Sequence, residues 1–201
     1  MTEFTNERPG SNRFKVAALQ VVRETGDLFS SVAESTAGFV KEAGHEALEA
    51  GDVLVDIIAG VIGAVVSIGH DAVEAARGIA LGVLRGKKAE PGSAFTTLAV
   101  SSRSVIRQVG RAGGDIAAAT RGLVAGAAEG ARELGMDVSE AVFAVSRGAL
   151  QGAREFGYAA GEEVREAVAA MREIVRGREP GRSHFEEMED TPMFFPGPMV
   201  E

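Results

Sequence analysis

The side chains that could do chemistry are few in this 201-residue chain, and their spacing predicts neither a metal centre nor a nucleophile. None of the three histidines has a partner at ligand spacing: His45, His70 and His184. The pair His45-Glu46 lacks the second histidine that a zinc-protease helix carries. The chain has no cysteine, which excludes disulfides, thiolate metal sites and a cysteine nucleophile. We expect histidines on solvated helix faces, and no metal or cofactor.

Carboxylates and glycine-rich segments give no better candidate for catalysis. Glu162, Glu163 and Glu166 indicate a charged helix face rather than a general acid–base pair. The sequence contains no phosphate-binding glycine loop after a strand, no G-x-S-x-G elbow and no convincing strand. The sequence therefore predicts a protein that is not an enzyme.

Positive charge gathers in the middle of a chain whose net charge is −8. The overall acidity argues against nucleic-acid binding, whereas the basic block between residues 77 and 114 suits phosphate or anionic lipid headgroups. Six residues are the candidates for contact with an anionic surface: Arg85, Lys87, Lys88, Arg103, Arg107 and Arg111. A solvated turn whose charges aid solubility would explain this basic block equally well. The last three arginines, spaced by four, equally suit a salt-bridged helix pair.

An apolar repeat of eleven residues must position these charges. Steps of eleven from Leu123, Ala127 and Ala131 meet only apolar residues as far as Val175, and the first half of the chain behaves similarly. Three apolar positions per eleven residues match the pitch of a nearly straight α-helix. The candidate apolar contact stripe comprises Phe29, Val40, Leu54, Ile58, Ile62, Val65, Leu123, Leu134, Val138, Val142, Val145, Phe156, Val164 and Met171.

Composition divides the chain into five segments: a disordered arm at 1–12, a helical repeat at 13–86, a basic Pro/Gly turn at 87–94, a second helical repeat at 95–177 and an acidic tail at 178–201. We expect an all-α fold made of two long helices in an antiparallel hairpin or an elongated bundle. Pairs such as Gly114-Asp115 favour a second arrangement, in which glycine ends one helix and aspartate caps the next. The unbroken phase of the stripe favours the long helices.

Glycine weakens any such helix, since each costs about 1 kcal/mol relative to alanine. Many of the 26 glycines are spaced by four, as in Gly78/Gly82/Gly86 and Gly122/Gly126/Gly130. This spacing permits close helix contact. The alternative is helicity that depends on a partner or a membrane.

Two further segments are candidates for contact. Val53 to Gly69 is apolar around most of a helix, but it includes Asp56 and is too short for a comfortable membrane span. We expect a buried helix or an interfacial insertion there. The tail mixes acids with Phe, Met and Pro, and its candidate docking peptide for a protein partner is Met193, Phe194, Phe195 and Pro196.

The repeat of alanine, glycine and valine resembles lipid-surface helix proteins, namely synucleins, perilipins, apolipoproteins and phasins. Gly114 to Thr120 (GDIAAAT) is similar to a short stretch of synuclein. The chain lacks the lysine-rich core of synuclein repeats and the proline punctuation of apolipoproteins. The resemblance implies reversible coating of a lipid droplet, granule or membrane.

Three hypotheses follow from the sequence. The first is an amphipathic protein that coats or remodels a lipid or granule surface, cytoplasmic and peripherally attached. The second is a self-assembling coiled-coil scaffold. The third is a helical protein that inserts into membranes through Val53 to Gly69.

Overall fold

The structure is a computed structural model that describes residues 28–49, 55, 58–62 and 72–177. Within these residues the chain forms six α-helices with defined bounds, a further helical stretch at 58–62, one 3₁₀ helix and no strand. The α-helices are α2 (Leu28–Glu49), α4 (Ala72–Gly86), α5 (Pro91–Arg111), α6 (Ile116–Leu134), α7 (Val138–Ala153) and α8 (Tyr158–Gly177). The 3₁₀ helix η1 (Arg154–Phe156) follows α7 directly. Both terminal segments, 1–12 and 178–201, lie outside the described residues.

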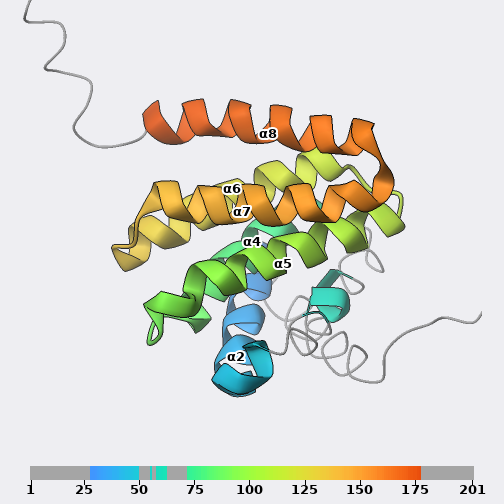
Figure 1. The fold of residues 1–201 in the computed structure, drawn as a ribbon. Helices are drawn as coiled ribbons and strands as arrows, with labels where there is room; N and C mark the ends of the chain where they lie inside the picture. Colours follow the sequence, from blue (N-terminus) through green and yellow to red (C-terminus); the bar gives the residue numbers. More distant parts are fainter. Residues whose placement is uncertain (1–27, 50–54, 56–57, 63–71, 178–201) are drawn as a thin grey trace, which may run out of the picture.

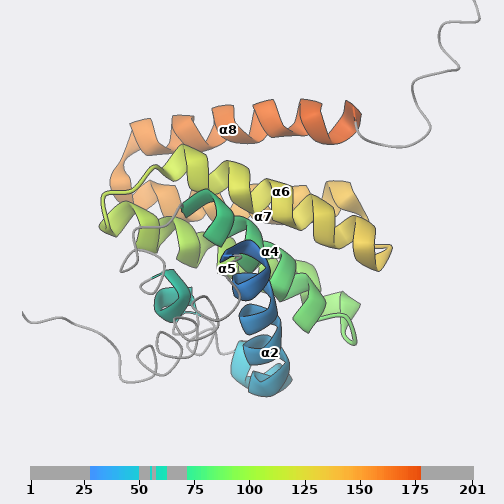
Figure 2. The same cartoon turned by 180° about the vertical axis from the view of Figure 1, so that it is seen from behind.

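The prediction of two long helices is wrong, because short helices form a layered bundle instead. The helices lie in successive layers, with α8 on one outer side, then α6 and α7, then α4 and α5, and α2 farthest from α8 (Figures 1 and 2). The breaks follow the arrangement that glycine and aspartate pairs favour. Gly113 and Gly135 adopt φ values of 72° and 68°, which end α5 and α6 at little steric cost.

Aspartate begins the two helices that follow these glycines. The Asp115 carboxylate accepts a hydrogen bond from the Ala118 amide at 2.7 Å. The Asp137 carboxylate accepts one from the Glu140 amide at 2.8 Å. Each bond satisfies an amide that the helix itself leaves free. The turn between α4 and α5 is closed differently, by Pro91 in the first turn of α5.

The stripe keeps its phase through the break between α6 and α7, because these two helices begin two periods of the stripe apart. The interval from the start of α6 at Ile116 to the start of α7 at Val138 shows that this helix and its turn together occupy two periods. The chain therefore reverses without shifting the apolar positions out of phase.

The stripe forms the core of the bundle. Several of its leucines and valines are fully buried in the second half, as at Leu123 and Val145, and alanines fill the remaining space. Within Val53–Gly69 the structure describes residue 55 and residues 58–62, of which Ile58, Val61 and Ile62 are buried in the same core. Leu54 and Val65 lie outside the described residues.

Glycine rows bring the helices into backbone contact. A Cβ atom on Gly78 would lie 2.8 Å from the carbonyl oxygen of Phe29, and one on Gly152 would lie 2.7 Å from that of Arg103. Gly126 faces the carbonyl oxygen of Arg77 even more closely. Such spacing leaves no room for a side chain and permits Cα–H···O contacts. Three helix pairs, α2 with α4, α4 with α6 and α5 with α7, are packed in this way.

The same sequence separation recurs in all three pairs. The interval from Phe29 to Gly78 equals the interval from Arg77 to Gly126 and the interval from Arg103 to Gly152. Within each pair a second glycine contact keeps this separation, as between Ala33 and Gly82, so the paired helices run parallel.

We expect Gly126→Ala to lower the free energy of unfolding by about 1 to 3 kcal/mol, because its methyl group would overlap the Arg77 carbonyl. Gly38→Ala is the matched control, since nothing lies within 4 Å of a Cβ there. The control should gain up to about 1 kcal/mol from helix propensity. Urea unfolding followed by circular dichroism measures both, and equal gains in the two variants would contradict the packing described here.

Candidate functional site

Most of the predicted contact stripe lies inside the bundle rather than on its surface. The buried members are Val40, Ile58, Ile62, Leu123, Val142, Val145 and Val164. The half-buried members are Phe29, Leu134, Val138 and Met171. Only Phe156 is exposed among the described members, with 37% of its surface accessible. In this closed arrangement the stripe packs helix on helix.

The predicted basic block separates into two places. At the α4 end, Arg85 donates to the Glu133 carboxylate of α6 through Nε at 3.0 Å and Nη2 at 2.7 Å. Lys87 is buried and pairs with Glu90 at 2.7 Å, whereas Lys88 is exposed. Hydrogen bonding to Arg85 lowers the pKa of Glu133, and the same bond raises the pKa of Arg85. These residues brace the turn between α4 and α5 against α6.

The other three predicted arginines converge on one carboxylate. Arg103, Arg107 and Arg111 lie on successive turns of α5, and Glu155 lies on η1. Arg107 Nε is 2.9 Å from Glu155 Oε1, Arg111 Nη2 is 3.6 Å from Oε2, and Arg103 Nη2 is 4.0 Å from Oε1. The pattern confirms the salt-bridged alternative, yet one carboxylate cannot neutralise three guanidinium groups. Among the described residues this cluster therefore carries a surplus of two positive charges.

Two aromatic residues follow Glu155 closely in the sequence. The Phe156 ring packs on Gly110 of α5, where a Cβ would lie 2.6 Å from ring atoms Cε2 and Cζ. Gly157, with φ of 99°, then reverses the chain, and Tyr158 begins α8 with 81% of its surface exposed. We name Arg103, Arg107, Arg111, Glu155, Phe156 and Tyr158 the basic aromatic patch.

Sequence reasoning finds only part of this patch. The arginines stand out by their spacing of four, but Glu155 is 48 residues from Arg107 and no local pattern links them. The apolar period places Phe156 in the stripe, although it lies in a 3₁₀ turn at the surface. The one available signal for Tyr158 is that it is the single tyrosine in the chain.

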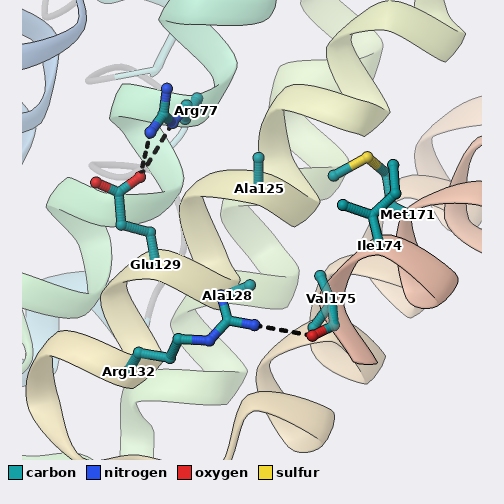
Figure 3. Close-up of a pocket in the computed structure, with 8 residues that line it drawn as sticks. All are labelled: Arg77, Ala125, Ala128, Glu129, Arg132, Met171, Ile174 and Val175. Carbon is teal, nitrogen blue, oxygen red and sulfur yellow. Dashed lines mark hydrogen bonds and ion pairs between the residues drawn. The ribbon is translucent and has the colours of Figure 1, made fainter. Parts of the chain in front are cut away.

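A second feature is a pocket between α6 and α8, with α4 at one side (Figure 3). Its lining residues are Arg77, Ala125, Ala128, Glu129, Arg132, Met171, Ile174 and Val175. Arg77 donates to Glu129 at 2.6 Å and lies 4.3 Å from the centre of the Phe29 ring. Arg132 donates to the carbonyl oxygen of Val175 at 3.0 Å, which closes the last turn of α8 onto α6.

The other candidate sites have less support in the structure. Among the described residues, no group of three His, Asp or Glu side chains could hold a metal ion. No helix in the described part of the chain is both long and apolar enough to cross a membrane. His70, His184 and the predicted docking peptide from Met193 to Pro196 lie outside the described residues.

The pair of Arg85 and Glu133 makes the stability of the bundle depend on pH. The pKa of Glu133 is lowered in the folded state, so its contribution is complete above the ordinary carboxyl pKa and is lost as pH falls through the lowered value. We expect Glu133→Gln to cost less than about 1 kcal/mol at neutral pH, because the pair is exposed to solvent. Thermal unfolding should show the cost at pH 7 and none in strong acid. A cost that stays constant with pH would contradict the ion-pair origin.

Comparison with known proteins does not assign this chain to a family. No protein-family model matches the chain, and no curated protein matches its sequence.

Proposed function

We propose that the protein binds peripherally to an anionic lipid or hydrophobic granule surface, and that the basic aromatic patch makes the first contact. The observation that carries this proposal is the convergence of three arginines on Glu155, which the exposed Tyr158 follows closely in the sequence. Surplus cationic charge beside an exposed amphipathic ring suits a membrane interface.

The charges of the patch act against the charge of the chain as a whole. A protein with a net charge of −8 is repelled by an anionic surface unless a local positive region faces it. Each arginine near such a surface contributes about 1 kcal/mol of attraction, and its apolar stem can lie along the interface while the guanidinium group meets phosphate. The patch therefore orients the bundle as well as binding it.

The aromatic residues supply the apolar part of the contact. Phe156 is held on Gly110 and Tyr158 follows a glycine turn, so both rings are presented from a braced position. A phenol ring lies at headgroup depth with its hydroxyl group in water. The proposal places the protein in the cytoplasm at the membrane or granule surface, which suits a chain without cysteine.

Self-assembly into a coiled-coil scaffold has less support. The glycine rows that a scaffold would use face other helices of the same chain, as at Gly82, Gly126 and Gly148. Light scattering of the purified protein tests this alternative directly, since a scaffold requires oligomers larger than a dimer.

Binding to vesicles tests the lipid proposal. Arg103→Gln, Arg107→Gln and Arg111→Gln together should weaken binding to phosphatidylserine-containing vesicles more than tenfold, given about 1 kcal/mol for each arginine. The control is Arg121→Gln with Arg147→Gln, which removes exposed arginines from α6 and α7. Co-sedimentation at low and physiological salt measures all three proteins.

Tyrosine emission offers a second readout. Tyr158 is the single tyrosine and the chain has no tryptophan, so acrylamide quenching of tyrosine fluorescence reports on the patch alone. Anionic vesicles should protect Tyr158 from quenching, and neutral vesicles should not. Absence of protection, or equal weakening of binding in the control variant, would contradict the proposal.

A further inference from the structure

The pocket between α6 and α8 has the chemistry of a peptide-binding groove. Met171 and Ile174 of α8 face Ala125 and Ala128 of α6, and Arg132 lies beside this apolar wall (Figure 3). Ile174 leaves 49% of its surface exposed, so the described helices do not cover this wall. An apolar wall beside a cation fits a ligand that joins apolar side chains to carboxylates.

The two arginines at the pocket differ in what they can still bind. Arg77 uses Nε and Nη2 on Glu129 and stacks on Phe29, so its donors are directed away from a ligand. Arg132 gives one hydrogen bond, from Nη2 to the carbonyl oxygen of Val175. A guanidinium group carries five N–H donors, so Arg132 retains the capacity to bind a carboxylate.

The sequence that continues beyond α8 matches this chemistry. Val175 lines the pocket and α8 ends at Gly177, so the segment 178–201 starts at the edge of the pocket. Its first apolar residues are Phe185 and Met188, which alternate with carboxylates in the sequence Phe-Glu-Glu-Met-Glu-Asp. Phe185 comes ten positions after Val175, a length of chain that can return to the pocket.

We propose that the segment Phe185–Asp190 docks in this pocket of its own chain. Phe185 and Met188, three positions apart, contact Met171 and Ile174, and a carboxylate of the segment binds Arg132. Tethering favours this occupant over a second copy, because a short linker gives an effective concentration in the millimolar range. The docked segment covers the apolar wall that Ile174 otherwise leaves in water.

Paramagnetic broadening in the full-length protein tests the docking. The absence of cysteine lets a nitroxide be attached at Glu187→Cys alone. The methyl signals of Met171 and Ile174 should lose most of their intensity, whereas those of Met136 and Ile106, outside the pocket lining, should be retained. Retained intensity at Met171 and Ile174 would overturn the proposal.

A matched pair of variants identifies the segment that docks. Adding Phe185→Ala and Met188→Ala to the labelled protein should restore the Met171 and Ile174 signals. Adding Phe194→Ala and Phe195→Ala, which removes two apolar side chains from the same tail, should not restore them. The reverse result would overturn the choice of segment.

Two measurements test whether docking requires the charge of Arg132 and whether the segment docks within its own chain. Arg132→Gln should restore the Met171 and Ile174 signals, whereas Arg121→Gln, on the same helix, should leave them broadened. Mixing nitroxide-labelled protein with isotope-labelled protein that carries no nitroxide should give no broadening. Broadening in the mixture would assign the docking to a second copy and overturn the proposal.

Discussion

Close approach of helix backbones through glycine is the constraint on which the rest of the bundle depends. Ala and Val dominate the core, and such small side chains fill little space between helices at ordinary separations. Gly78, Gly126 and Gly148 let one backbone lie on the carbonyl oxygens of another, so the small side chains of the core still meet in close contact. The cost of glycine to each helix is thus offset by contacts that alanine would prevent.

The all-α class could be predicted from the sequence, but the length of the helices could not. A stripe that repeats every eleven residues has the same appearance in one straight helix and in helix–turn units that each span two periods. The decisive residues are Gly113, Gly135, Asp115 and Asp137, whose turn and capping geometry breaks the chain. Capping chemistry is local and distinguishes the two arrangements, whereas the phase of the stripe is common to both.

The candidate site shows a similar division between local and long-range information. The spacing of Arg103, Arg107 and Arg111 marks one helix face, and the possibility of an ion-paired helix partner follows from it. Their common partner, Glu155, is fixed by the parallel packing of α5 and α7, which no local pattern encodes. The exposure of Phe156 depends on a 3₁₀ turn whose position the apolar period conceals.

The constant sequence separation between the glycine-packed helices has a consequence for how the molecule forms. Each of these pairs joins segments at the same moderate distance along the chain, as from Phe29 to Gly78 and from Arg103 to Gly152, so no contact between the two ends of the chain is needed to begin. Folding can therefore start at any adjacent group of helices and extend in either direction, as in repeat proteins. A growing chain can add each helix during synthesis to a helix that precedes it in the sequence and has already formed. Evolution can likewise lengthen or shorten such a molecule by whole units while its remaining packing is preserved.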